Sequence, residues 1–177
     1  MRIVLTGVPG TGKTSLAKWI SRKTGSRLVS INEMVKKKKL FTGKEAGALV
    51  ARMKPLEREL KKALAKEEKV VLEGHLACEF SLPADLVIVT RTKPSVLRKR
   101  LLQRNYPKKK TEENVLAEML DYATVLAEKN LARAKIFEVE TSSFQKARKA
   151  VEEILRGRGK RFKAGWVSWG RELEKAY

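Results

Sequence analysis

The chain has 177 residues, of which 40 are Lys or Arg and 20 are Asp or Glu, giving a formal net charge of +20 at pH 7. Its length suits one domain with at most a small insertion, and its 42% hydrophobic content excludes a compositionally disordered chain. The single cysteine, Cys78, excludes an intramolecular disulfide and an all-cysteine zinc site. The sequence shows neither a signal peptide nor an apolar run of the roughly 18–20 residues that a membrane helix needs. We therefore expect a cytoplasmic protein with no membrane partner.

Strands and helices are predicted to alternate along the chain. Short apolar runs predict strands, and apolar residues at helical spacing predict helices. In chain order these are a strand at 2–6, a helix at 13–23, a strand at 27–31, helices at 33–39 and 46–65, strands at 69–72 and 86–90, helices at 94–103 and 111–134, a strand at 134–139 and a helix at 143–155. Such an alternation predicts an α/β fold with a parallel sheet covered on both faces.

The segment Gly7-Val8-Pro9-Gly10-Thr11-Gly12-Lys13-Thr14 matches the phosphate-loop pattern G-x-x-x-x-G-K-[ST] between a predicted strand and a predicted helix. Its glycines let several backbone N–H groups point into one concavity, which together with the helix N-terminus holds phosphate oxygens. We expect Lys13 to reach the β- and γ-phosphates of a nucleoside triphosphate and the Thr14 hydroxyl to ligate Mg²⁺. The alternative is a tight glycine turn followed by a chance lysine.

Polar residues follow the predicted strand at 69–72, where the chain reads Glu73-Gly74-His75. Enzymes with a phosphate loop use an acidic residue at the end of a neighbouring strand to hold magnesium, and Glu73 is predicted to do so through water. His75 stands beside it, where an imidazole can orient or activate a water molecule. The alternative for His75 is a purely structural histidine in a loop.

Several motifs together carry a family resemblance over residues 1–155. They are the phosphate loop, Glu73-x-His75, Arg104-Asn105-Tyr106 with the lysine-rich segment after it, and Glu113-Asn114-Val115-Leu116-Ala117-Glu118. This set resembles adenylate kinase isoenzyme 6, a family with a nuclear, coilin-interacting ATPase in eukaryotes and counterparts in archaea. The resemblance implies a three-layer fold like that of nucleoside monophosphate kinases, with a small monophosphate-binding insertion and a short lid. It also implies adenylate kinase and ATPase activity, and a role in late maturation of the small ribosomal subunit.

The resemblance assigns roles to individual residues. Those that would hold the ATP phosphates are Gly10, Thr11, Gly12, Lys13, Thr14 and Ser15. Arg104 would be the lid arginine on the triphosphate, in a lid at about 104–112. Glu73, where eukaryotic members usually have Asp, and His75 would serve magnesium-bound water and ATP hydrolysis. The monophosphate segment would span about 30–54, with Lys36 at an arginine position of the family and Arg52 as a substitute on the AMP phosphate.

The segment 156–177 lies outside the resemblance and mixes cations with aromatic residues. We expect it to contact RNA phosphates through five cations, namely Arg156, Arg158, Lys160, Arg161 and Lys163. Unpaired bases would stack on Phe162, Trp166 or Trp169. The alternative is that the two tryptophans pack back on the domain. Through the family role, the resemblance implies ribosomal RNA and a platform ribosomal protein of the universal protein eleven family as partners.

We therefore expect an enzyme that uses Mg-ATP as donor and AMP as acceptor. Because a short lid excludes water incompletely, ATP hydrolysis is expected to compete with transfer to AMP. Two other functions stay open. One is a housekeeping small-molecule or nucleotide kinase with no ribosomal role, and the other is a nucleotide-gated switch that binds RNA or protein.

Overall fold

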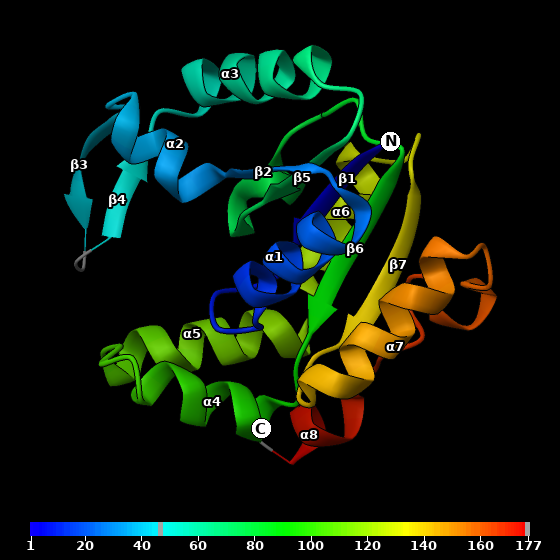
Figure 1. Ribbon diagram of the computed structural model, residues 1–177. Coiled ribbons are helices and arrows are strands. Elements are labelled where there is room, and N and C mark those ends of the chain that lie inside the picture. Colours follow the sequence, from blue (N-terminus) through cyan, green and yellow to red (C-terminus); the bar gives the residue numbers. More distant parts are fainter. Residues whose placement is uncertain (46–47, 176–177) are drawn as a thin grey trace.

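The computed structural model describes residues 1–45 and 48–175 (Figure 1). Their main sheet has five parallel strands in the order β2-β5-β1-β6-β7. The strands are β1 (Arg2–Thr6), β2 (Arg27–Ser30), β5 (Val70–Glu73), β6 (Leu86–Arg91) and β7 (Lys135–Glu140). Each lies within one residue of its predicted bounds, because buried parallel strands are short continuous apolar runs.

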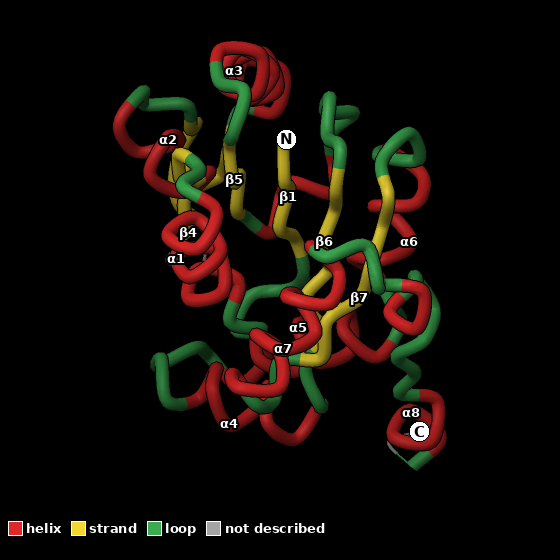
Figure 2. Tube along the Cα trace, turned by 45° about the vertical axis from the view of Figure 1, so that its right-hand side comes forward, coloured by secondary structure: helices red, strands yellow, loops and turns green. Residues whose placement is uncertain are grey.

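Helices cover both faces of this sheet, as Figure 2 shows. Alternate residues of β1 point to opposite faces: Ile3 and Leu5 pack with α1 (Lys13–Thr24) and α7 (Phe144–Leu155), and Val4 packs with α3 (Met53–Lys66), α6 (Tyr122–Asn130) and the 3₁₀ helix η1 (His75–Glu79). The predicted α/β phosphate-loop fold with three layers is confirmed. None of the described helices is both long and apolar enough to span a membrane.

The segment after β2 contains a hairpin whose second strand was predicted as helix. Helix α2 (Ile31–Lys37) is followed by β3 (Phe41–Glu45) and β4 (Ala48–Ala51), which pair in antiparallel fashion. The prediction of a helix over 46–65 is wrong at 48–51, while residues 46–47 lie outside the described range. Leu49 and Ala51 pack against the core while Val50 is exposed, which is the period-two alternation of a strand. Helix α3 begins only at Met53, with Pro55 in its first turn.

The predicted helix over 111–134 is also wrong, because two helices occupy that segment. Following α4 (Pro94–Leu102), α5 spans Lys108–Met119 and α6 starts at Tyr122. Asp121 interrupts them in the left-handed backbone region (φ 55°), and its carboxylate pairs with Arg91. Residues 104–112, the predicted lid, comprise the loop 104–107 and the first five residues of α5.

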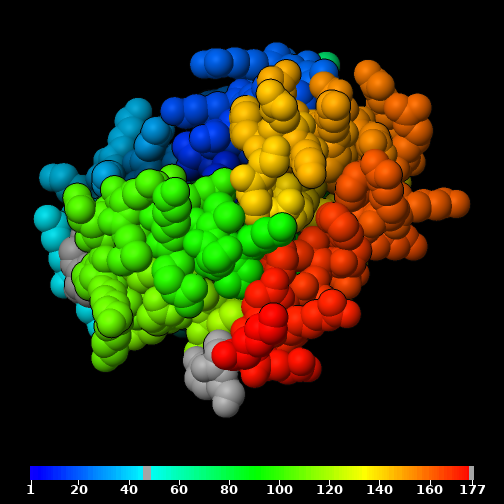
Figure 3. All heavy atoms as spheres, turned by 90° about the horizontal axis from the view of Figure 1, so that it is seen from below, coloured from blue at the N-terminus to red at the C-terminus, as the bar shows by residue number. Residues whose placement is uncertain are grey.

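The segment after α7 returns along the edge strand β7. It contains η2 (Lys160–Phe162), a bridge between Lys163 and Phe137, and α8 (Gly170–Glu174). In Figure 3 its red end lies beside the green region of α4 and α5. Phe162 and Trp169 are 6% exposed, so their rings are closed to nucleotide bases, whereas Trp166 is 47% exposed. The alternative of a packed tryptophan therefore holds for Trp169.

Candidate active site

The phosphate loop runs from Gly7 to Gly12, between the end of β1 and the start of α1. Gly12 has a left-handed backbone (φ 82°) directly before the helix. Gly10 also has a positive φ (91°), and a Cβ placed there would lie 2.7 Å from Cδ1 of Leu97. Only glycine combines these two properties without strain. The loop is therefore packed closely against α4.

Two side chains of the loop are turned inward. The fully buried Thr11 hydroxyl hydrogen-bonds to the carbonyl of Val8 (2.9 Å) and to Oγ1 of Thr90 (2.7 Å). The Nζ atom of Lys13 donates to the same Val8 carbonyl (2.8 Å). Burial lowers the pKa of Lys13 to about 8, while the carboxylate of Glu73 acts in the opposite direction. Thr11 thus anchors the loop to Thr90 of β6, and the side chain of Lys13 folds back onto the loop.

Glu73 lies at the carboxyl end of β5 and is only 3% exposed. Its two oxygens accept hydrogen bonds, Oε2 from the Thr14 hydroxyl (3.1 Å) and Oε1 from the Ser30 hydroxyl (2.7 Å). The structure therefore joins two predicted site residues and adds Ser30, which the sequence reasoning missed. Ser30 is the last residue of β2 and pairs in register with Glu73. Ser30 could have been found from the sequence, because parallel strands bring their carboxyl ends to the same edge of the sheet and Ser30 and Glu73 both end a strand.

The oxygen atoms of Thr14 and Glu73 fit a magnesium ion. Mg²⁺ takes oxygen ligands, and in phosphoryl-transfer sites it needs only one or two from the protein because substrate phosphates and water supply the others. Within residues 1–45 and 48–175 there is no group of three or more His, Cys, Asp or Glu side chains arranged to hold a metal ion. This donor set suits a cation that arrives with a nucleotide. Ser15, next to Thr14, is exposed in the first turn of α1.

His75 is the first residue of η1 and is half-buried. Its pKa is lowered to about 4, chiefly by burial and also by the positive charges of Lys13 and Lys110. The imidazole is therefore neutral at pH 7 and is able to accept a proton or a hydrogen bond from water. Its backbone carbonyl accepts a hydrogen bond from the Thr6 hydroxyl (3.3 Å), which fixes η1 to the end of β1.

Cations from the predicted lid approach this centre. The exposed Arg104 lies close enough to Lys13 to contribute to the lowering of its pKa. Lys110, in the first turn of α5, acts in the same way on His75. Lid cations thus lie close enough to Lys13 and His75 to lower the pKa values of these two side chains, and Lys110 comes from the lysine-rich part of the predicted lid.

The two residues predicted for AMP come before and after the β3–β4 hairpin in the chain. Lys36 is exposed in α2, and Arg52 is exposed at the start of α3. Neither forms an ion pair with any described residue. An opening of about 470 Å³ separates the hairpin from the lid. It is lined by Glu45, Leu49 and Val50 on the hairpin side and by Pro107, Lys109, Lys110 and Glu113 on the lid side.

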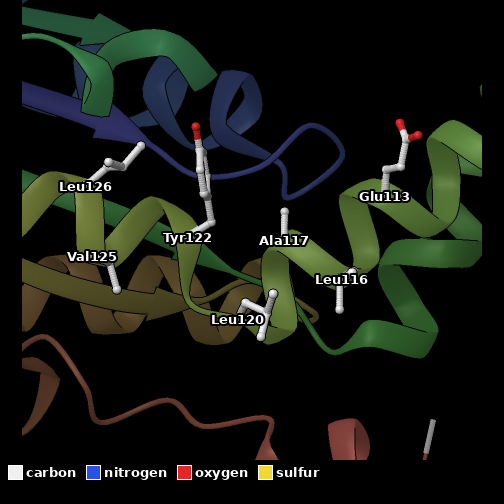
Figure 4. A pocket seen from close by; sticks show the side chains of 7 residues that line it. All are labelled: Glu113, Leu116, Ala117, Leu120, Tyr122, Val125 and Leu126. Carbon is white, nitrogen blue, oxygen red and sulfur yellow. The ribbon is translucent and has the colours of Figure 1, made fainter. Parts of the chain in front are cut away.

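A second hollow of about 380 Å³ lies over α5 and α6 (Figure 4). It is lined by Glu113, Leu116, Ala117, Leu120, Tyr122, Val125 and Leu126. With a single charged side chain in its lining, it lacks the cations that a nucleotide phosphate requires. The candidate active site is therefore the carboxyl edge of the sheet, where Lys13, Thr14 and Glu73 come together.

The predicted RNA cations all lie at the surface, far along the chain from this site. Arg156, Arg158, Lys160, Arg161 and Lys163 are exposed. Arg161 is partly neutralised, because it pairs with Glu153 (2.7 Å).

A buried ion network beneath the phosphate loop also escaped the sequence reasoning. Arg91, 1% exposed at the end of β6, pairs with Glu118 of α5 (2.9 Å), with Glu138 of β7 and with Asp121. Paired charges of this kind are the condition under which ions are buried. The available signal was Arg91 at the end of the apolar strand β6 together with Glu138 inside the neighbouring strand β7.

Comparison with known proteins places the chain in a family. Residues 3–121 match the family model described as "AAA domain". A protein of Methanocaldococcus jannaschii is 34% identical over 96% of this chain and 93% of its own length, and one of Archaeoglobus fulgidus is 36% identical over 98% and 94%. Both are named "Putative adenylate kinase". This chain belongs to their family.

The family makes the chain a nucleotide kinase, and a phosphate-loop kinase implies ATP and usually Mg²⁺. Solved structures show the same fold. Shikimate kinase from Bacteroides thetaiotaomicron has a TM-score of 0.58 at 24% identity and covers 88% of this chain and 98% of its own. Shikimate kinase from Acinetobacter baumannii, in complex with shikimate, has a TM-score of 0.61 at 17% identity and covers 89% and 94%. At these identities the likeness concerns the fold alone.

Proposed function

We propose that this protein is an adenylate kinase that transfers the γ-phosphoryl group of Mg-ATP to AMP and yields two ADP. The observation that carries the proposal is the array of Lys13, Thr14 and Glu73 at the carboxyl edge of the sheet, where the Thr14 hydroxyl donates to the Glu73 carboxylate and Lys13 folds onto the phosphate loop. The names of its relatives support AMP as the acceptor.

The chain's own groups would act mainly by positioning charge. Lys13 leaves the Val8 carbonyl to bind the β- and γ-phosphates, while the loop N–H groups bind further phosphate oxygens. Arg104 adds positive charge at the transferring group when the lid closes. Thr14, and Glu73 through water, would hold a magnesium ion, which would supply positive charge against the phosphates.

We assign AMP to the wall formed by residues 30–54. Lys36 and Arg52 are the cations proposed for its phosphate, and both are exposed and without a protein carboxylate partner among the described residues. A lysine grips phosphate as a point charge, so AMP binding through Lys36 would be weaker than through an arginine fork.

Water is proposed as a second acceptor, which would make the protein an ATPase as well. The neutral, half-buried imidazole of His75 supports this, because it can accept a hydrogen bond from a water molecule near the γ-phosphate. The short lid supports it too, since it excludes solvent incompletely.

Product analysis tests both activities. Purified protein is given Mg-ATP with and without AMP, and ADP and free phosphate are counted separately. AMP-dependent formation of two ADP per ATP, with little phosphate, is expected for the kinase, and phosphate release that His75→Ala removes is expected for the ATPase. A fast transfer to an acceptor other than AMP would favour a different small-molecule kinase. Negligible transfer with ATP-dependent partner binding would favour a nucleotide-gated switch.

A role in small ribosomal subunit maturation is proposed from the resemblance to adenylate kinase isoenzyme 6 together with the exposed tail cations. Ribosomal RNA would bind through the segment 156–163, and a platform ribosomal protein would be the protein partner. Co-sedimentation of the purified protein with small subunits, with and without ATP, tests this role. Absence from the subunit fractions in both conditions would reject it.

A further inference from the structure

The C-terminal strap, residues 165–169, is bound to two buried carboxylates. The N–H groups of Gly165 and Val167 donate to Oε2 of Glu138 (3.1 and 2.9 Å), which is 0% exposed. The indole N–H of Trp169 donates to Oε1 of Glu118 (3.0 Å), which is 1% exposed. Buried carboxylates require such donors, so the strap is an integral part of the fold.

Through Glu118 the strap reaches the helix that carries the lid. The same Oε1 atom also accepts hydrogen bonds from Nε of Arg91 (2.9 Å) and from the backbone N–H of Thr92 (3.0 Å). Glu118 belongs to α5, whose first turn carries Lys110 toward His75. Trp169 therefore helps to tie α5 to the end of β6.

On its other side the strap contributes to the packing of the phosphate loop. Trp169 and Val167 share one apolar cluster with Val8 of the loop and with Leu97 of α4. The Val8 carbonyl holds the ammonium group of Lys13. One indole thus has a hydrogen bond to the lid helix and apolar packing in the cluster that supports the loop.

We propose that Trp169 is a positioning residue that holds α5 and the phosphate loop in their catalytic arrangement, acting through Glu118 and the cluster of Val8. The inference rests on the proposed kinase function for its kinetic readout. A displaced lid or loop weakens contacts that form fully only in the transition state. We therefore expect kcat to fall more than the KM for ATP rises.

The test compares Trp169→Phe with Trp166→Phe in the full-length chain. Both variants lose an indole N–H bond from the same segment, since Trp166 donates to the carbonyl of Glu138 (2.8 Å). Trp166, however, is 47% exposed and stacks edge-on against Phe162, outside the cluster of Val8. For Trp169→Phe we expect kcat to drop about tenfold with the KM for ATP within about twofold. For Trp166→Phe we expect both within about twofold.

Hydrogen–deuterium exchange provides a readout that does not depend on activity. In Trp169→Phe the amides of residues 7–13 and 108–118 should exchange faster than in Trp166→Phe, with the rest of the chain unchanged. Equal exchange in these segments, or uniform acceleration along the whole chain, would overturn the inference. If Trp169→Phe does not fold, Val167→Ala trims the same cluster and is judged by the same criteria.

The two proposals fail in distinguishable ways. Wild-type protein that forms no ADP from ATP and AMP would reject the kinase function, and the exchange comparison would still decide the role of Trp169. Wild-type kinase activity with an unchanged kcat in Trp169→Phe would reject only the role of Trp169.

Discussion

Thr14 and Glu73 lie on neighbouring structural elements, and a 3.1 Å hydrogen bond joins their side chains. One belongs to the first turn of α1 and the other to the end of β5. Because Ser30 holds the second oxygen of Glu73 at 2.7 Å, the carboxylate has little rotational freedom. The ligands proposed for magnesium are thus preorganised, which reduces the cost of assembling the site.

Replacing Glu73 by Gln should separate the effect of its charge from the effect of its shape. The amide keeps an acceptor oxygen, but it loses the charge that would hold magnesium-bound water. We expect kcat for ADP formation to fall by about 10²-fold or more, measured with saturating Mg-ATP and AMP. Ser30→Ala removes one hydrogen bond and keeps the carboxylate, so it should cost about tenfold or less. A Glu73→Gln enzyme as active as Ser30→Ala would contradict the assignment.

His75 should make the stability of the protein depend on pH. Its folded pKa of about 4 lies below its ordinary value of 6.5, so the stabilisation from the neutral imidazole is complete above pH 6.5. It is lost progressively as the pH falls from 6.5 toward 4. Urea unfolding at pH 7.5 and pH 5 should show that the wild type loses about 1–2 kcal/mol more than His75→Gln. Equal losses in the two proteins would show that His75 titrates normally.

Arg91 should be far more important for stability than an arginine at the surface. Replacing it by Met leaves the buried carboxylates of Glu118 and Glu138 without their cation, which we expect to lower the free energy of unfolding by about 3–5 kcal/mol. Arg98→Met is the matched control, because its pair with Glu112 is exposed and should contribute less than about 1 kcal/mol. Chemical denaturation at pH 7 measures both, and similar values for the two variants would refute the expectation.

Two glycines of the phosphate loop should differ in their tolerance of alanine. Both have a positive φ, but a Cβ at Gly10 meets Leu97 at 2.7 Å whereas a Cβ at Gly12 meets nothing within 4 Å. Gly12→Ala should cost about 1 kcal/mol of backbone strain. Gly10→Ala adds a steric clash of about 1–3 kcal/mol. Thermal unfolding of both variants tests this order, and a Gly12→Ala protein less stable than Gly10→Ala would reverse it.

The five tail cations should weaken RNA binding when they are neutralised together. Changing Arg156, Arg158, Lys160, Arg161 and Lys163 to Gln removes the proposed phosphate contacts, so we expect affinity for a single-stranded RNA to fall at least about tenfold at fixed salt. The control changes five exposed cations in α3 and just after it, namely Arg58, Lys61, Lys62, Lys66 and Lys69. ATP turnover should stay unchanged in both. If fluorescence anisotropy gives the two variants equal RNA affinity, RNA binding depends on net charge alone and not on the tail.

The sequence was sufficient where structure is determined locally. Apolar runs such as 86–90 predicted the strands, and the glycine pattern with Lys13 predicted the phosphate loop. It failed where tertiary contacts override propensity. Leu49 and Ala51 form a strand because they pack against the core, although alanine and leucine favour helices. Asp121 ends α5 because its carboxylate pairs with a buried arginine 30 residues earlier.

The candidate site shows the same difference between features determined locally and features determined by tertiary contacts. Thr14 and Glu73, which were predicted for one site from a motif and from a strand end, are joined by a hydrogen bond, while their roles stay predictions. The contact of Ser30 with Glu73 was missed because it depends on strand order. Lys110 was predicted only as part of the lysine-rich lid, because its nearness to His75 depends on where α5 starts. The inward orientation of Thr11 was equally hidden, since it depends on Thr90 in a strand far along the chain.

The bridge between Phe137 and Lys163 also has a consequence for solubility. β7 is an outer strand of the main sheet, and an outer strand offers unpaired backbone groups to other chains. The returning segment covers part of that edge and places a lysine there, so a second molecule cannot easily add its own strand. A chain cut after α7 would expose the β7 edge beside Phe137, and we expect it to aggregate as its concentration rises.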